Sequence, residues 1–244
     1  MNLLLNKHEF IRFISDLHLT PAEKRLDTFY LFLNSLPKTC KGLFILGDFF
    51  DYWIGLDIHQ SEYQNLQDKL KSFHCPIFFL PGNRDFLIED TWLKDTNLIK
   101  LSDPAKICIN DKDIMLTHGD QLCLNDKNYQ IFRRITRNHF TRSLFLNLPK
   151  AIRKFIFKQI RNNKQKDVFL NKYAIDEPSV EKLCNLHQVN VIIHGHIHMP
   201  GIHVNGQIKR IVLDEWMAGN NKEHNVSYLD INEQHIFCLN QMVS

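Results

Sequence analysis

Short motifs rich in Asp, Asn and His recur along this chain, and each follows a run of apolar residues. Together they supply seven side chains that can bind a metal ion: Asp16, His18, Asp48, Asn83, His118, His196 and His198. An apolar run that gives way to polar residues is typical of a buried strand whose loop emerges at one edge of a sheet. The chain must therefore fold so that loops from position 16 to position 198 meet at one edge.

Each motif on its own has an ordinary explanation. An Asp after a strand usually caps a helix or forms a turn, an Asn after Gly usually lies in a turn, and a single His is usually a surface or core residue. Five such motifs in order favour a site instead. We leave His194 out of it, because Gly195 interrupts the strand there and makes His194 a structural neighbour.

The mixture of donor groups indicates which metal and which chemistry the site would serve. Carboxylate, amide and imidazole groups without thiolate suit divalent ions such as Mn²⁺. Seven donors are too many for one tetrahedral ion and suit two ions that share a ligand, with Asp48 able to bridge them. Two adjacent cations can activate a water and neutralise a phosphate. The sequence therefore predicts a hydrolase of phosphoesters or phosphoanhydrides.

The apolar pattern of the first hundred residues alternates between strand and helix, which predicts an α/β fold. We expect a helix after Thr20, with Pro21 and Glu23 completing its N-terminal cap, and a second helix over 59–73. Strands are expected at 10–15, 42–47, 76–80, 189–193, 227–231 and 236–239. Hairpins are expected over 107–117, turning at Asp111-Lys112, and over 202–213, turning at Asn205-Gly206.

The composition is that of a globular protein. A chain of 244 residues with 44% hydrophobic residues can form one large domain with a substantial core. We find no apolar run long enough for a transmembrane helix and no evident signal peptide. The six cysteines are scattered without a Cys-x-x-Cys pair, which indicates reduced core thiols in a cytosolic protein.

Charge is unevenly distributed along the chain. Residues 127–172 contain 13 Lys and Arg and one acidic residue, a net charge of +12, whereas the rest of the chain has a net charge of −9. We predict that 125–175 is a helical basic insertion, or cap, within a single domain spanning 1–244. Its apolar stripe could pack on the core beneath a solvated basic face, touch an anionic membrane and admit acyl chains, or stack on nucleic acid.

In their order along the chain, the five motifs resemble the pattern of the calcineurin-like metallophosphoesterases. That pattern runs Asp-x-His, Gly-Asp-x-x-Asp, Gly-Asn-His-Asp/Glu, a single His, and Gly-His-x-His, and it covers positions 14–198 here. The resemblance implies a two-sheet αββα sandwich with two metals at one edge. By the same resemblance, one metal would be held by Asp16, His18, Asp48 and His198. The other would be held by Asp48, Asn83, His118 and His196.

One departure from the superfamily pattern is informative. Arg84 replaces a His that follows the Asn in many members and is often assigned to protonating the leaving group. Arginine cannot donate its proton at neutral pH, but it can bind a phosphate through two hydrogen bonds. A phosphate leaving group departs as a stable anion, so the substitution favours cleavage of a pyrophosphate bond over dephosphorylation of a protein. The alternative role for Arg84 is a salt bridge to Asp85.

Several longer strings resemble the UDP-2,3-diacylglucosamine pyrophosphatases of lipid A synthesis. They are Ser-Asp-Leu-His-Leu at 15–19, Gly-Asn-Arg-Asp-Phe-Leu at 82–87, His-Gly-Asp-Gln-Leu-Cys at 118–123 and His-Gly-His-Ile-His-Met-Pro at 194–200. The resemblance covers nearly the whole chain. It implies that a water activated by two metals attacks the α-phosphorus of UDP-2,3-diacylglucosamine, giving UMP and 2,3-diacylglucosamine 1-phosphate (lipid X). The insertion would form a lid over the acyl chains.

The same resemblance implies a role for several residues. The catalytic residues would be Asp48, Asn83, Arg84 and His196. The substrate contacts would be Asn83, Arg84, Asp126, Tyr129, Lys164, Lys172 and His196. Asn83 and Arg84 would contact the phosphate and Asp126 the glucosamine, while either Lys172 or Asn171 could supply the last contact. The protein would act at the cytoplasmic face of a bacterial inner membrane, bound peripherally to its anionic surface.

Two other functions are weighed against this one. A two-metal phosphodiesterase acting on nucleotides or nucleic acid could use the same scaffold, but the basic segment is its only support and we expect no nucleic-acid partner. A binding module that had lost catalysis would be expected to lack ligands, yet all seven are present. The sequence does not predict the oligomeric state or the acyl-chain length.

Overall fold

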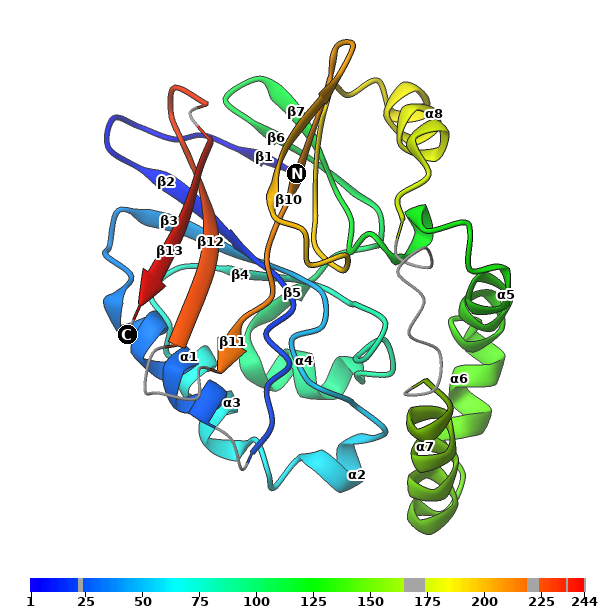
Figure 1. The fold of residues 1–244 in the computed structure, drawn as a ribbon. Coiled ribbons are helices and arrows are strands. Elements are labelled where there is room, and N and C mark those ends of the chain that lie inside the picture. The colour runs from blue at the N-terminus through cyan, green and yellow to red at the C-terminus, as the bar shows by residue number, and fades with distance from the viewer. Residues whose placement is uncertain (22–23, 165–173, 219–223, 236, 244) are drawn as a thin grey trace.

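The computed structural model describes residues 1–21, 24–164, 174–218, 224–235 and 237–243 (Figure 1). Over these residues the strands form two sheets. In order across the sheet, the six-stranded one contains β1 (Asn2–Leu3), β6 (Ala105–Ile109), β7 (Lys112–Leu116), β8 (Val191–His194), β10 (Ile208–Val212) and β9 (Gly201–Asn205). The seven-stranded one contains β11 (Met217–Ala218), β12 (His224–Asn232), β2 (Phe10–Ile14), β3 (Cys40–Leu46), β4 (Ile77–Leu80) and β5 (Leu98–Lys100), with β13 (Phe237–Val243) paired to β12.

The two sheets pack face to face, because alternate residues of each strand point to opposite sides. Along β2, Ile11 and Phe13 belong to the core between the sheets, together with Ile114 and Ile193 of the other sheet. Ile14 belongs to a second core on the outer side of the seven-stranded sheet. Full burial of each such side chain contributes about 1.5–3 kcal/mol to stability.

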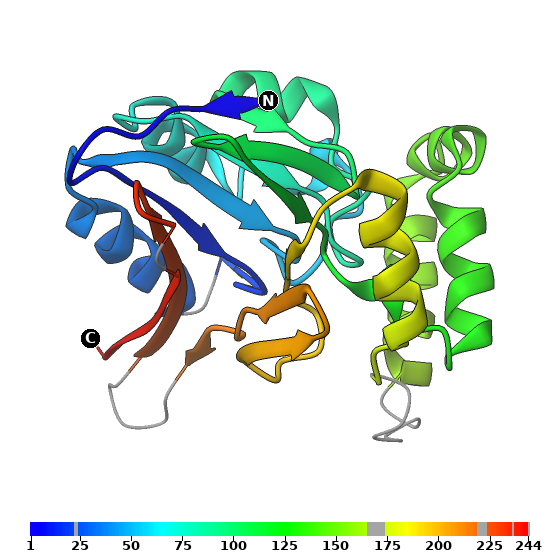
Figure 2. The ribbon, with the colours of Figure 1, turned by 90° about the horizontal axis from the view of Figure 1, so that it is seen from above.

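Helices cover both outer faces of the sandwich, as seen in Figure 2. The second core is covered by α1 (Lys24–Ser35), α3 (Gln64–Lys71) and α4 (Asp90–Thr96). A third core joins α8 (Glu177–His187) to the six-stranded sheet through Val180, Cys184 and Ile192. The layers therefore run helix, sheet, sheet, helix, which confirms the αββα fold predicted from the sequence.

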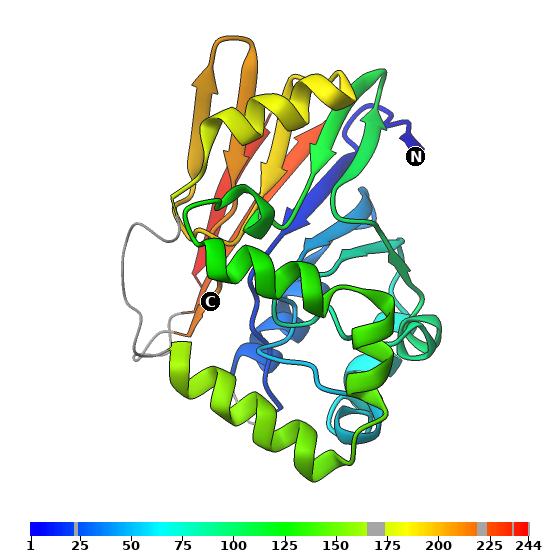
Figure 3. The ribbon, with the colours of Figure 1, turned by 90° about the vertical axis from the view of Figure 1, so that its right-hand side faces the viewer.

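Three further helices stand beside the sandwich: α5 (Lys127–Thr136), α6 (His139–Leu146) and α7 (Lys150–Lys164), shown in Figure 3. The carboxylate of Asp126 accepts a hydrogen bond from the amide of Tyr129 and so caps α5, and Asn138 caps α6 in the same way. Pro149 precedes α7 and separates it from α6. We call α5, α6 and α7 the cap. It is helical, as the apolar spacing predicted.

The structure corrects three expectations about local elements. The expected N-terminal cap at Thr20 and Pro21 is wrong, because Pro21 lies in a turn and Leu19 pairs with Phe50 in an extended bridge; the described helix is Lys24–Ser35. Glu23 lies outside the described residues. The helix expected over 59–73 is shorter, α3, and a separate short helix, α2 (Leu56–His59), precedes it. Between them the buried Tyr63 packs its ring on Phe50 and donates a hydrogen bond to the carbonyl of Leu19. The first hairpin turns one residue earlier than expected, at Asn110-Asp111.

The strand order brings the loops of the five motifs together. Strands β2, β3 and β4 run parallel and adjacent in one sheet, and β7 and β8 do so in the other. The carboxyl ends of parallel strands lie at the same edge of a sheet. Because the two sheets are stacked, both edges face one region beside the cap (Figure 1).

In the described part of the chain, no helix combines the length and the apolarity needed to span a membrane.

Candidate active site

The five motifs lie at the ends of five strands and meet at one edge of the sandwich. The donors form two sets of three, and within each set the ligand atoms lie within 4.8 Å of one another. One set is Asp16, His18 and His198, and the other is Asp16, Asp48 and His118. Every residue in these sets is buried except His198, which is partly exposed. The structure thus brings together side chains that are up to 182 positions apart in sequence.

The backbone of these motifs is unusual. Five of the seven predicted ligands adopt positive φ angles, between 49° and 68°: Asp16, His18, Asp48, His196 and His198. This left-handed conformation is uncommon for residues other than glycine, and it concentrates at functional sites, where the surrounding structure holds it in place. The motif loops are therefore shaped to aim side chains and not to continue their strands.

Two glycines make room for the carboxylates. A Cβ atom on Gly82 would lie 2.2 Å from Oδ1 of Asp48, and one on Gly195 would lie 2.1 Å from Oδ2 of Asp16. Real Cβ atoms do not approach other atoms so closely, so any larger residue would displace the carboxylate. The glycines in the Gly-Asn and Gly-His motifs are thus part of the site.

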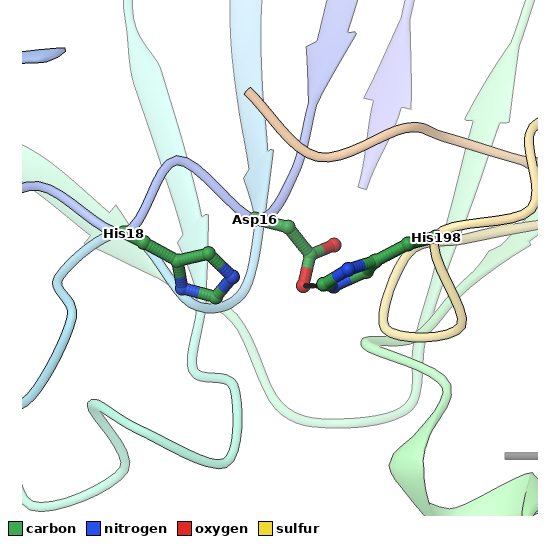
Figure 4. Close-up of side chains that lie close together, drawn as sticks. All are labelled: Asp16, His18 and His198. Atoms are coloured by element: carbon green, nitrogen blue, oxygen red, sulfur yellow. Dashed lines mark hydrogen bonds and ion pairs between the residues drawn. The ribbon is translucent and has the colours of Figure 1, made fainter. Parts of the chain in front are cut away.

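The first set of donors is built around Asp16, whose carboxylate lies between the rings of His18 and His198 (Figure 4). Nε2 of His198 is 3.3 Å from Oδ1 of Asp16, and its Nδ1 is 3.0 Å from Oε2 of Glu215. Both ring nitrogens of His18 are buried and have no hydrogen-bond partner among the described residues. Buried polar atoms are normally paired, so a bound cation would supply the partner that His18 lacks.

The second set is built around His118. Its Nδ1 lies 3.0 Å from the carbonyl oxygen of Leu46, which can only accept, so Nδ1 carries a hydrogen and Nε2 is the nitrogen that could bind a metal once it loses its proton. That Nε2 lies 2.9 Å from Oδ1 of Asn83 and 3.6 Å from Oδ1 of Asp48. The ring of His196 lies 5.0 Å from that of His118, centroid to centroid. These donors fit a second cation, and Asp16 is common to both sets.

Electrostatics in the protein without bound metal agree with two cation sites. Burial disfavours a charged His118, but Asp48, Asp16 and Asp120 outweigh it and raise the pKa of His118 to about 9. Burial is likewise outweighed at His198, where hydrogen bonds to Asp16 and Glu215 raise the pKa to about 10. Protons on these two rings thus balance the carboxylates in the metal-free protein, and bound cations would take over that role.

A cavity of about 1040 Å³ opens from this edge towards the cap. Its polar end is lined by Asp48, Asn83, Arg84, His196 and His198. Its apolar end is lined by Trp53, Leu87, Phe132, Phe145, Ile156, Phe157 and Ile160. The space therefore joins the metal-binding donors to a hydrophobic chamber formed largely by the cap helices.

A sequence model described as calcineurin-like phosphoesterase matches residues 11–200, which contain all seven donors and the whole cap. The chain belongs to the calcineurin-like phosphoesterase family.

Within this family the chain is similar to relatives named UDP-2,3-diacylglucosamine hydrolase. It is 37% identical to the one from Haemophilus influenzae, over 86% of this chain and 91% of that relative. It is 37% identical to the one from Wigglesworthia glossinidia brevipalpis, over 84% and 86%, and 33% identical to the one from Vibrio parahaemolyticus, over 84% and 89%. Among the calcineurin-like phosphoesterases, the chain belongs with these hydrolases.

Arg84, which replaces the His found in many calcineurin-like phosphoesterases, points into the cavity. Its guanidinium lies 2.5 Å from Oδ1 of Asp51, and its Nε lies 3.4 Å from Oδ2 of Asp48. Asp85 does not pair with it. The buried Asp85 carboxylate instead accepts hydrogen bonds from the amides of Gly82 and Phe49, each at 2.7 Å. Burial and the nearby Asp48 raise the pKa of Asp85 to about 7. The alternative role for Arg84, a salt bridge to Asp85, is wrong.

The remaining predicted substrate contacts fall into two groups. Asp126 and Tyr129, at the start of α5, line the cavity near the metal donors. Lys164 is the last residue of α7, but its side chain lies outside the described part of the structure, as do both Lys172 and Asn171. The insertion therefore contributes two of the predicted polar contacts to the described cavity.

Sequence reasoning missed two acidic residues that contact predicted site residues, Glu215 and Asp120. Glu215 contacts His198, and Asp120 accepts a hydrogen bond from the hydroxyl of Tyr129 at 2.6 Å. The sequence did indicate a role for Asp120, because Asp120 belongs to the His-Gly-Asp motif and follows His118 by two positions. No sequence pattern indicated a role for Glu215, because Glu215 reaches His198 from a separate segment after β10.

Proposed function

We propose that this protein hydrolyses the pyrophosphate bond of UDP-2,3-diacylglucosamine, giving UMP and 2,3-diacylglucosamine 1-phosphate. One observation carries the proposal: a single cavity holds metal-binding donors at one end and apolar cap residues at the other. A substrate that suits both ends has a phosphate group next to lipid chains. The named relatives point to the same substrate.

The chain's own residues would divide the reaction between them. The seven donors would hold two divalent cations, which when bound supply an activated water and neutralise phosphate charge. Arg84 would bind the phosphate through two parallel hydrogen bonds and stabilise the charge that develops on it. Asn83, beside it, would orient the same phosphate. Attack at the α-phosphorus releases a sugar phosphate, which leaves as a stable anion and needs no protonated His.

Arg84 is held ready for this role by the two aspartates around it. Its contacts with Asp51 and Asp48 fix the guanidinium above the metal donors. Asp51 also lies 3.2 Å from Arg161 of α7, so the same carboxylate connects Arg84 to the cap. A bound phosphate would take over hydrogen bonds of Arg84 that Asp51 accepts in the free protein.

Mn²⁺ is the cation that we propose for both positions. The donor set contains three carboxylate or amide residues and four imidazoles, and no thiolate lies among them. Carboxylate and amide oxygens suit Mn²⁺, and the lack of thiolate disfavours the softer ions.

We also propose that the protein works at the cytoplasmic face of an inner membrane, bound peripherally to its anionic surface. The cap exposes several large apolar side chains: Ile131, Ile135, Phe140, Leu144, Ile152 and Phe155. Residues 127–172 carry a net charge of +12, which would attract anionic lipid head groups. Apolar side chains among basic ones are typical of surfaces that lie on a membrane.

The test is hydrolysis of UDP-2,3-diacylglucosamine with added Mn²⁺ in ¹⁸O-labelled water, followed by mass spectrometry. We expect UMP carrying the label and an unlabelled diacylglucosamine 1-phosphate. UDP-N-acetylglucosamine, which has the same pyrophosphate but no acyl chains, should react far more slowly. Single-stranded DNA and RNA should not react. Label in the lipid product would contradict attack at the α-phosphorus, and hydrolysis of nucleic acid without hydrolysis of the lipid would favour the phosphodiesterase alternative.

A further inference from the structure

Two arginines and two aspartates form a cluster between the cap and the metal-bearing loops, outside the lining of the cavity. They are Arg133 of α5, Arg137 at the C-cap position that follows α5, Asp103 in the loop before β6, and Asp120 just after His118. The side chains of Asp103 and Asp120 are at most 4% exposed, and those of the arginines less than one-fifth exposed. Buried carboxylates paired in this way are strongly coupled to their partners.

One face of α5 is directed at Asp120. Tyr129, Arg133 and Arg137 are spaced four residues apart, so they lie on the same side of the helix. Each donates a hydrogen bond to Oδ2 of Asp120: the Tyr129 hydroxyl at 2.6 Å, Nε of Arg133 at 3.0 Å and Nη2 of Arg137 at 2.8 Å. The helix is therefore fastened to the residue that lies two positions after a predicted metal ligand.

Arg137 reaches further than its neighbours. Its Nη2 also lies 3.1 Å from the carbonyl oxygen of Gly82, the residue before Asn83, and its Nη1 lies 3.2 Å from Oδ2 of Asp103. The other oxygen of Asp103 accepts hydrogen bonds from the hydroxyl of Thr117 at 2.7 Å and the amide of His118 at 3.3 Å. One guanidinium thus contacts the loop that carries Asn83 and, through two carboxylates, both sides of His118.

From these contacts we propose that Arg137 is a positioning residue that couples the docking of α5 to the Asn83–His118 half of the metal centre. The inference rests on the proposed two-metal function. Removing the guanidinium would leave Asp120 with fewer donors and the Gly82 carbonyl without this bond, so both loops would lose a shared anchor. Among the described residues, His18 and His198 of the other half make no hydrogen bond or ion pair with the cluster, so they should keep their geometry.

The coupling must also run in the opposite direction. If docking of α5 favours cation binding at Asn83 and His118, cation binding must favour docking of α5 by the same free energy. Mn²⁺ should therefore slow hydrogen exchange of the α5 amides, and this effect should depend on Arg137. An arginine that serves only to stabilise the fold would not link cation binding to the docking of α5.

The experiment compares Arg137→Ala with a matched control, Arg134→Ala. Arg134 is exposed on the same helix and carries the same charge, so its loss tests charge alone. Calorimetric titration with Mn²⁺ should give two sites in the wild type and in the control. In Arg137→Ala one site should keep its affinity and the other should weaken by about 10- to 100-fold, the usual effect of removing a residue that orients metal ligands.

Electron paramagnetic resonance gives a readout that does not depend on activity. At two equivalents of Mn²⁺, the wild type and the control should show the spectrum of a coupled ion pair, and Arg137→Ala the six-line spectrum of isolated ions. Mn²⁺ should protect the α5 amides from exchange in the first two proteins only. Two unchanged sites with a coupled spectrum in Arg137→Ala would overturn the inference.

A second variant covers the case in which Arg137→Ala does not fold. Arg137→Lys keeps the charge but cannot reach three acceptors at once. The Asn83–His118 site should therefore lose affinity for Mn²⁺, but less than in Arg137→Ala, and unchanged affinity would overturn the inference. Failure of the wild type to bind two Mn²⁺ would instead overturn the proposed two-metal function, and the inference with it. An effect of Arg134→Ala equal to that of Arg137→Ala would show that charge alone matters, which also overturns the inference.

Discussion

Asp16 and Asp48 are the two carboxylates on which the metal centre depends. The family resemblance implies Asp48 as the shared ligand, whereas the geometry places Asp16 in both sets of donors. Each lies against a glycine whose missing Cβ leaves space for the carboxylate, Gly195 at Asp16 and Gly82 at Asp48. Both carboxylates are also bound by backbone amides, Asp16 by that of His196 at 2.9 Å and Asp48 by that of Arg84 at 2.9 Å.

We predict that Asp48→Ala abolishes turnover. Loss of an orienting residue around a metal typically lowers activity or affinity by about 10- to 100-fold, so loss of a direct ligand should lower kcat by at least about 100-fold. The variant should be stripped with chelator, reloaded with Mn²⁺ and assayed beside the wild type. Activity near the wild-type level after reloading would refute the role of Asp48.

Arg84 is predicted to act on the transition state. Arg84→Ala should lower kcat by about 100- to 1000-fold, the usual effect of losing one donor to a developing charge. Arg84→Lys should recover little, because an ammonium cannot form two parallel hydrogen bonds. The side chain is 39% exposed, so the melting temperature should change little. Steady-state kinetics would check this, and a rise in KM with unchanged kcat would mean that Arg84 contributes only to binding.

His118 and His198 give the metal-free protein a defined dependence on pH. Burial is outweighed by the carboxylates around them, which raise their pKa values to about 9 and about 10, above the unfolded value of about 6.5. Their contribution to stability is full below pH 6.5 and is lost as the pH rises through 9 and 10. Because metal binding displaces these protons, the Mn²⁺-loaded protein should not show this loss of stability at high pH. Urea unfolding with chelator and with Mn²⁺, from pH 6.5 to 9.5, should show the difference in stability widening; parallel curves would contradict it.

At the scale of elements, the cap is fastened to the sandwich at both ends. Through α5 it is bound by the arginine cluster, and through α7 by Arg153, whose side chain is only 3% exposed. Arg153 donates hydrogen bonds to the carbonyls of Ile54 at 2.6 Å and Leu148 at 2.9 Å, and pairs with Asp57. The stacked rings of Tyr52 and Phe157 lie further along α7, with centroids 4.5 Å apart.

Arg153→Ala should therefore loosen the cap. It leaves the Ile54 and Leu148 carbonyls without these donors, and loss of the buried hydrogen bond to Ile54 should cost about 1–3 kcal/mol. Lys154→Ala, at the next and exposed position of the same helix, is the control and should change stability by less than about 0.5 kcal/mol. Urea unfolding and hydrogen exchange of α7 would measure both. Equal behaviour of the two variants would show that Arg153 does not anchor the cap.

Element types could be predicted where one hydrophobic periodicity dominated. The prediction failed where a single side chain determined the ends of an element. The buried strands before Asp16, Asp48 and Asn83 were visible as apolar runs. The separation of α2 from the later start of α3 was not, because Tyr63 between them reaches the Leu19 carbonyl, a contact across 44 residues. The basic face of α5 looked like a solvated surface, yet Arg133 and Arg137 pair with buried carboxylates that the sequence places elsewhere.

At the scale of the whole molecule, the sandwich and its cap form one reaction chamber. The strand order gathers five loops at one edge, and the cap closes the apolar side of the cavity over them. The ligand types and the fold class were predictable, because both follow from the ordered motifs. How the seven donors divide into two sets was not, since it depends on loop conformations at positive φ that no periodicity encodes.

Anomalous diffraction from crystals loaded with Mn²⁺ tests the central claim most directly. The account predicts two manganese peaks close together, one bounded by Asp16, His18 and His198 and the other by Asn83, His118 and His196. Data collected on both sides of the manganese edge would identify the ion. A single peak, or peaks away from these seven side chains, would contradict the account.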